Sequence, residues 1–197
     1  MLSLISKRFT DFFLKKQIID EEKYEIIEYG FMITLSSLFC ILSILIISVI
    51  CGMIVEGITF LIVFMAIRTS CGGYHCSTYL KCWLFTNSIF LVYLAIIYFT
   101  KDLNVDIVSM VLLALCSLII VAFAPLINEN NPKGEKEIAE KKIKARIILS
   151  CYIVIFGVFF VFFRELNIHY FISLSITAVT ILMLITIIKE GKRCLRS

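Results

Sequence analysis

Residues 53–100 read MIVEGITFLIVFMAI (53–67), RTSCGGYHCSTYLKC (68–82) and WLFTNSIFLVYLAIIYFT (83–100), which is an apolar run, a polar island and a second apolar run. We refer to residues 68–82 as the polar island. It holds an arginine, paired glycines, the first of the two histidines of the chain, and three cysteines. Polar and ionisable groups are costly at membrane depth, so such a cluster between two apolar runs indicates a functional site.

The composition of the whole chain sets the environment of this island. Of the 197 residues, 60% are hydrophobic, and the mean hydropathy is +0.99, which excludes an ordinary soluble domain. A bilayer core of about 30 Å needs roughly 20 apolar residues per helix. The sequence therefore predicts an all-α integral membrane protein with six transmembrane helices, at about 31–50, 53–67, 83–100, 105–127, 147–163 and 170–188.

We find no repeat and no low-complexity linker, so the expected division of the chain is simple. Residues 1–30 are predicted to form an amphipathic cytoplasmic or interfacial helix, 31–188 one six-span membrane domain, and 189–197 a basic cytoplasmic tail. The charged N-terminal segment lacks the pattern of a cleavable signal peptide, so we expect it to be retained. Its apolar residues recur at helical spacing, which favours a helix lying along the membrane. The acidic residues at 20–28 keep open a soluble helix packed on the loops.

The basic residues predict the orientation of the chain in the membrane. Most of them fall in three regions, 1–30, 128–146 and 189–197, which should be cytoplasmic. With six spans, both termini and the polar island then face the cytoplasm of a multi-pass protein in the cell membrane. The net charge of +4 is attributed to this orientation and to contact with anionic lipid headgroups. No basic and aromatic surface pattern predicts a nucleic-acid partner.

The polar connection at 128–146 begins with turn-forming residues and continues with alternating Glu and Lys. The pairs Glu137–Lys141 and Glu140–Lys144 have the i,i+4 spacing that supports a solvated short helix. A contact with substrate is the alternative role for this connection.

The eight cysteines of the chain fall into two groups. Four lie in or at the ends of apolar spans, where a free thiol behaves as a small hydrophobe (Cys40, Cys51, Cys116 and Cys151), and Cys194 lies in the basic tail; none of these five is expected to be reactive. The other three lie in the polar island, and a cytoplasmic position argues against structural disulfides there. A metal site would have to use the adjacent residues His75 and Cys76 and lacks the usual paired-cysteine spacing, so we expect no metal and no cofactor.

His75 and Cys82 are the candidate catalytic residues. A cysteine attacks as the thiolate, and a neighbouring histidine or a helix N-terminus favours that form. On a continuous helix the two residues would lie about 10 Å apart, so the backbone must bend between them. Gly72 and Gly73 supply conformational freedom just before His75. The alternative is an interfacial histidine with no catalytic role.

These residues together resemble a known family. The pattern Arg68-x3-Gly72-Gly73-x-His75-x6-Cys82, after two spans and a charged N-terminal segment, is similar to the AgrB family of accessory gene regulator membrane endopeptidases. Ala124-Pro125 and Asn131-Pro132-Lys133 are similar to that family as well. The resemblance covers nearly the whole chain.

The resemblance implies a function. Cys82 would be the nucleophile and His75 its base, with Arg68 and Gly73 required around them. The substrate would be an AgrD-like precursor, cleaved through a thioester and cyclised to a thiolactone or lactone quorum-sensing peptide, and the protein would be a homodimer. Gly72 and Gly73 could offer N–H groups to the oxyanion, and Arg68 could hold a carboxylate of the substrate or the oxyanion. Headgroup contact is the alternative for Arg68.

Three further residues, Ser77, Thr78 and Asn87, could orient His75, although polar residues near a helix start are commonly caps. Two rival classes of protein remain. A transporter or channel would place ionisable residues near the middle of several spans, which are nearly free of charge here. A sensory or scaffolding membrane protein would have no need of His75 and Cys82.

Overall fold

The computed structural model describes residues 2–72, 78–126 and 135–194, and every regular element within them is helical. The α-helices are α1 (Leu2–Lys15), α2 (Tyr24–Ile50), α3 (Ile54–Cys71), α4 (Tyr79–Thr100), α5 (Asp106–Phe123), α6 (Glu135–Phe162) and α7 (Ile168–Cys194). Short 3-10 turns precede α2 (Glu21–Lys23) and α7 (Arg164–Leu166). Within these ranges, six helices, α2 to α7, are long and apolar enough to cross a membrane.

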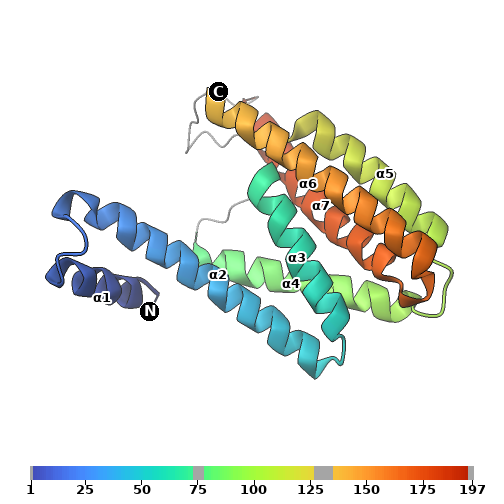
Figure 1. The fold of residues 1–197 in the computed structure, drawn as a ribbon, viewed down its shortest axis with the longest axis horizontal. Helices are drawn as coiled ribbons and strands as arrows, with labels where there is room; N and C mark the ends of the chain where they lie inside the picture. The colour runs from blue at the N-terminus through green and yellow to red at the C-terminus, as the bar shows by residue number, and fades with distance from the viewer. Residues whose placement is uncertain (1, 73–77, 127–134, 195–197) are drawn as a thin grey trace.

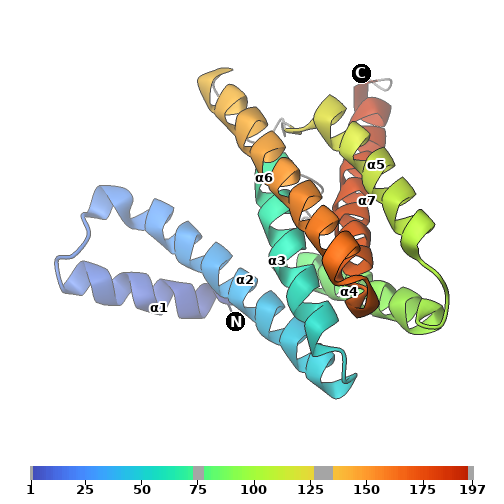
Figure 2. The same ribbon diagram turned by 45° about the vertical axis from the view of Figure 1, so that its right-hand side comes forward.

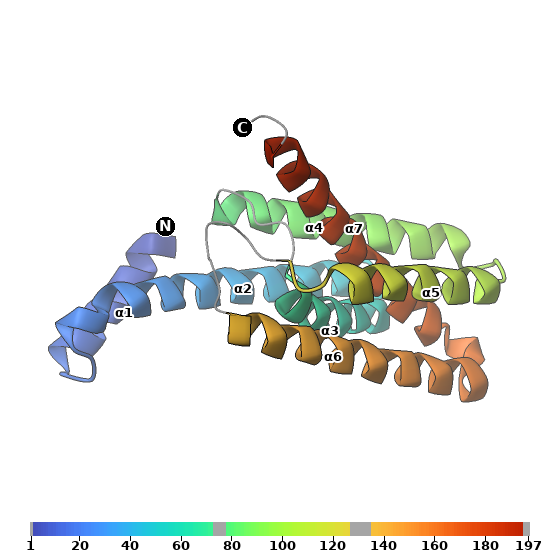
Figure 3. The ribbon, with the colours of Figure 1, turned by 90° about the horizontal axis from the view of Figure 1, so that it is seen from above.

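Helix α7 is the most buried span and contacts α3, α4, α5 and α6. Figure 1 shows α3, α5, α6 and α7 gathered into one bundle, with α1 and α2 extending away from it. After a turn of 45° the same separation is visible (Figure 2). Seen from above, α7 runs obliquely to α4 and α5 (Figure 3). Helices α3 to α6 therefore pack against α7, while α2 packs on α3 and α4.

An aromatic cluster joins α3 to α4 in the core. Phe60 lies 4.8 Å from Phe64, 5.0 Å from Phe90 and 4.9 Å from Tyr93, measured between ring centroids. The rings of Phe60, Phe64 and Phe90 are almost completely buried. Gly57, one turn before Phe60, lets α2 approach closely, because a Cβ there would overlap the hydroxyl of Ser48. These contacts set where α3 lies relative to α2 and α4.

The expected helix over residues 1–30 is shorter in the structure. α1 ends at Lys15, and Gln17 has a φ of +53°, which turns the chain back. The segment then folds onto the start of α2: Phe13 stacks on Phe31 at 5.5 Å, and Tyr24 donates a hydrogen bond of 2.7 Å to Asp11. Residues 24–30 thus belong to the first span rather than to the N-terminal helix.

The second and fifth spans are longer than expected. α3 continues through Arg68 to Cys71, since the hydroxyls of Thr69 and Ser70 donate to the carbonyl of Ala66 and need no partner outside the helix. α6 begins at Glu135, so the expected separate short helix is instead the start of the fifth span. The predicted pairing of Glu137 with Lys141 is present at 3.6 Å.

The fourth span ends earlier than the expected 127. α5 stops at Phe123, and Ala124 is extended with a ψ of 143°. Pro125 follows, and the residue before a proline is disfavoured in helical geometry. The chain is then directed back across the end of α3.

Candidate active site

The described ends of the polar island lie on two helices. Arg68 is in the last turn of α3, Cys82 is in the first turns of α4, and Gly72 ends α3. Gly73, His75 and Cys76 lie outside the described residues, and so does the expected approach of His75 to Cys82.

Cys82 is half-buried at the N-terminal end of α4. The helix is capped by Thr78, whose side chain accepts a hydrogen bond of 3.3 Å from the N–H of Lys81. The N–H of Cys82 donates to the carbonyl of Thr78 at 3.1 Å. Thr78 therefore acts as a helix cap, the more ordinary of the two roles considered for it.

Arg68 reaches from α3 to α4 and contacts the candidate nucleophile. Its Nη2 lies 3.6 Å from Cys82 Sγ, and its Nη1 donates a hydrogen bond of 3.3 Å to Thr86 Oγ1. The guanidinium carbon lies 5.5 Å from the centre of the Phe64 ring. The sequence predicted a substrate carboxylate, the oxyanion or a headgroup as the partner of Arg68; among the described residues its guanidinium contacts the Cys82 sulfur.

Gly72 occupies a position that an L-residue with a side chain rarely adopts. Its φ is +75°, and a Cβ built there would lie 2.9 Å from the carbonyl oxygen of Leu126. Leu126 in turn donates a backbone hydrogen bond of 2.9 Å to Cys71. The N–H of Gly72 is bonded to the carbonyl of Arg68 at 3.1 Å, so in this structure it is not free to face an oxyanion. Gly72 instead joins the end of α3 to the segment after α5.

A second polar group holds α4 against α2 one turn below the site. Ser43 donates a hydrogen bond of 2.9 Å to the side-chain oxygen of Asn87 and accepts one of 3.1 Å from the indole of Trp83. Asn87 also donates to the carbonyl of Trp83 at 2.8 Å. Asn87 thus contributes to the α2–α4 contact.

The cysteines of the island separate in the structure. Cys71 is completely buried in the core cluster, which removes it from the candidate site. Cys82 alone among the described cysteines of the island is within reach of Arg68. Among residues 2–72, 78–126 and 135–194 no three His, Cys, Asp or Glu side chains come together as metal ligands.

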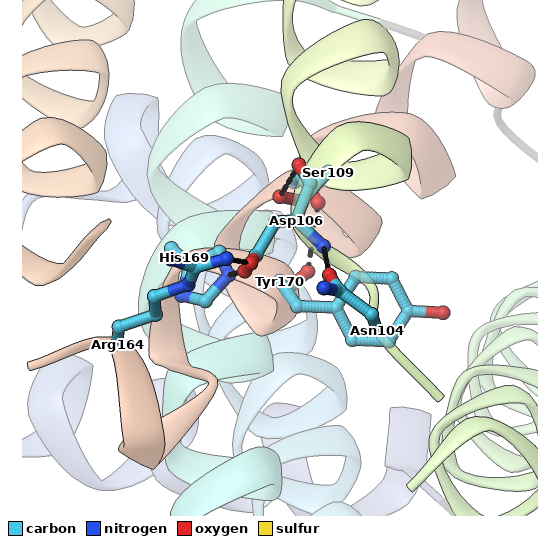
Figure 4. A network of polar contacts seen from close by, with 7 residues as sticks. Asn104, Asp106, Ser109, Arg164, His169 and Tyr170 are labelled. Carbon is cyan, nitrogen blue, oxygen red and sulfur yellow. Dashed lines mark hydrogen bonds and ion pairs between the residues drawn. The ribbon is translucent and has the colours of Figure 1, made fainter. Parts of the chain in front are cut away.

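Another polar network lies at the far end of α4, about 33 Å along the 22-residue helix. Figure 4 shows Asp106 at its centre, where the carboxylate accepts a hydrogen bond from Arg164 and lies 3.2 Å from Nε2 of the buried His169. The N–H of Asp106 donates to Asn104 at 3.1 Å. These contacts tie the start of α5 to the connection between α6 and α7.

A cavity of about 220 Å³ lies beside this network, between the ends of α3, α4 and α7. Glu56, Lys101, Asn167 and Tyr170 contribute polar groups to its wall. Sequence reasoning did not single out this network or Thr86. The signal for Thr86 was its position four residues after Cys82, on the same face of the helix.

The chain was compared with known proteins. A profile of the family described as Accessory gene regulator B matches residues 6–187. An AgrB-like protein of Clostridium perfringens (strain 13 / Type A) is 29% identical over 161 residues, which cover 79% of this chain and 75% of the relative. No solved structure matches. With six apolar helices and a family match over nearly its whole length, this chain is a multi-pass membrane protein of the AgrB family.

Proposed function

We propose that this protein is a membrane cysteine endopeptidase that cleaves the C-terminal tail of an AgrD-like precursor and promotes its cyclisation. Membership in the AgrB family implies a part in the processing of agr quorum-sensing peptides, and proteins of this family act with an AgrD precursor. The proposal adds the reaction mechanism and the residues: Cys82 as nucleophile, His75 as general base and acid, and Arg68 as the cationic partner of the sulfur.

The observation that carries this proposal is the 3.6 Å contact between Arg68 Nη2 and Cys82 Sγ. A cation beside the sulfur stabilises the thiolate, and the first turns of a helix add the positive end of the helix dipole. The guanidinium of Arg68 and the helix dipole therefore both act on the sulfur of Cys82, near the start of α4. Cys82 is also half-buried rather than enclosed. A nucleophile that attacks a peptide has to be accessible to it.

The reaction begins when His75 takes the proton of Cys82, and the thiolate attacks the carbonyl carbon at the cleavage point. The C–N bond breaks, and the leaving amine takes the proton back from the His75 imidazolium. The peptide is now a thioester of Cys82. A thiol or hydroxyl within the peptide next attacks this thioester with His75 as base. The C–S bond to Cys82 breaks, and a cyclic thiolactone or lactone is released.

The test is co-expression of the chain with an AgrD-like precursor, with the products analysed by mass spectrometry. Wild type should release the tail and a cyclic product, while Cys82→Ala and Cys82→Ser should release neither. Cys151→Ser, at an exposed position on α6, is the matched control and should process normally. Cys76→Ser should be much milder than either Cys82 variant. Processing by Cys82→Ala, or an equal loss in Cys82→Ser and Cys76→Ser, contradicts the proposal.

A further inference from the structure

Thr86 lies one helical turn after Cys82 and is buried, with 4% of its surface exposed. Its hydroxyl donates a hydrogen bond of 2.9 Å to the carbonyl of Cys82 and accepts one of 3.3 Å from Nη1 of Arg68. A hydroxyl has one hydrogen and two lone pairs. With the hydrogen committed to the carbonyl, the lone pairs are left for the guanidinium. The orientation of the hydroxyl is therefore set by the helix that carries the candidate nucleophile.

The two terminal nitrogens of Arg68 have different partners on α4. Nη1 is bonded to Thr86, and Nη2 lies against the sulfur of Cys82. A guanidinium is planar and holds its donors in a rigid fork, so anchoring one nitrogen restricts where the other can point. The hydroxyl of Thr86 thus restrains the second nitrogen at the sulfur.

A simpler role for Thr86 is that of a buried threonine whose hydroxyl makes its hydrogen bond within its own helix. Thr180 on α7 does this: it is 2% exposed and donates to the carbonyl four residues earlier at 2.9 Å. Thr86 makes the same intrahelical bond but also accepts from a side chain of another helix. That second contact distinguishes the two threonines and makes Thr180 the matched control.

We propose that Thr86 is a positioning residue, whose hydroxyl holds the guanidinium of Arg68 against the sulfur of Cys82 and so keeps that sulfur reactive. The inference deepens the proposed function, since its consequence for peptide cleavage depends on Cys82 being the nucleophile. The geometric part, that Thr86 acts on Cys82 through Arg68, holds without any peptide.

The experiment measures the rate of alkylation by iodoacetamide as a function of pH in the full chain, with Cys82 as the only cysteine. Thr86→Val keeps the shape of the side chain and removes the hydroxyl. We expect alkylation at neutral pH to slow about tenfold, the effect of one hydrogen bond to a charged group, and to recover at high pH. Thr86→Ser restores the hydroxyl and should stay within about twofold of wild type. Thr180→Val should match wild type.

A double-mutant cycle tests whether Thr86 acts through Arg68. Arg68→Gln alone should slow alkylation at neutral pH, and adding Thr86→Val should then cause little further loss. Independent effects that multiply would overturn the proposal. So would a wild-type pH profile in Thr86→Val, or an equal loss in Thr180→Val. If Thr86→Val does not fold, a Thr86→Ser protein with a strongly altered profile would likewise refute it.

The same variants distinguish this inference from the proposed function. If wild type fails to cleave the precursor, the endopeptidase proposal fails, while the alkylation profiles still decide the role of Thr86. If Thr86→Val cleaves and alkylates normally while Cys82→Ala is inactive, the endopeptidase proposal stands and the positioning role is refuted.

Discussion

The guanidinium of Arg68, in the last turn of α3, lies 3.6 Å from the sulfur of Cys82, in the first turns of α4. In the sequence, the two residues lie on either side of His75. A cation, a thiol and a helix N-terminus thus meet at one end of two adjoining spans, which makes this end of the protein the place to test for chemistry.

Replacing His75 should lower the reactivity of Cys82. If His75 stabilises the thiolate as an imidazolium, His75→Ala should slow iodoacetamide labelling of a Cys82-only protein at neutral pH, and labelling should recover at high pH. Precursor cleavage should fall in parallel. The measurement is the pH profile of labelling beside the cleavage yield. An unchanged profile together with normal cleavage would make His75 an interfacial histidine.

A side chain at Gly72 should strain the site. Gly72→Ala would place its Cβ 2.9 Å from the carbonyl oxygen of Leu126 in a backbone with a φ of +75°. We expect destabilisation of about 1–3 kcal/mol, seen as a lower Tm in detergent, together with reduced cleavage. Gly30→Ala is the control, because nothing lies within 4 Å of a Cβ at that position. If the two variants are equally stable, the backbone at Leu126 shifts to make room for the Cβ at position 72 with no loss of stability.

The orientation of the chain can be tested with a thiol reagent that does not cross membranes. The exposed Cys51 ends α2 and Cys82 lies in the first turns of α4, so the one span between them, α3, should put them on opposite sides of the membrane. A Cys51-only protein should be labelled in intact cells, whereas a Cys82-only protein should be labelled only after the cytoplasmic side is opened. Labelling of Cys82 in intact cells would reverse the predicted orientation.

The network around Asp106 should contribute to stability rather than to the chemistry. Asp106→Asn weakens the pairing with Arg164 and His169. We expect a loss of about 1–3 kcal/mol in the free energy of unfolding, mostly from the contact with the buried His169, because Arg164 is 58% exposed and solvent screens its pairing. Thermal unfolding in detergent measures this, and the exposed Asp102→Asn is the control. At temperatures below its lowered Tm, the Asp106→Asn protein should still cleave the precursor. Loss of cleavage without loss of stability would instead couple this end of the protein to the site.

The number of spans and their approximate positions could be predicted from the sequence, because hydrophobic length is a local property of consecutive residues. The helix boundaries also depended on contacts between residues that are far apart in the sequence. α3 extends past Ile67 with the hydroxyls of Thr69 and Ser70 bonded to Ala66. Within this extension Arg68 contacts Thr86 and Cys82 on α4, and no pattern within residues 53–71 predicts those contacts. Likewise, the fourth span is short because Pro125 directs the chain toward Gly72.

The sequence was enough to select Cys82 and His75 as candidates and to relate them to a family, because the spacing of reactive residues along one short segment is itself a local pattern. The tertiary structure alone brought the guanidinium of Arg68 to the sulfur of Cys82 and the hydroxyl of Thr86, assigned Asn87 to Ser43 on α2, and assembled Asp106, Arg164 and His169 at the far end. Those pairings join residues from different helices. They depend on which helix faces pack together, and that is decided by the summed packing between the helices rather than by any one stretch of chain.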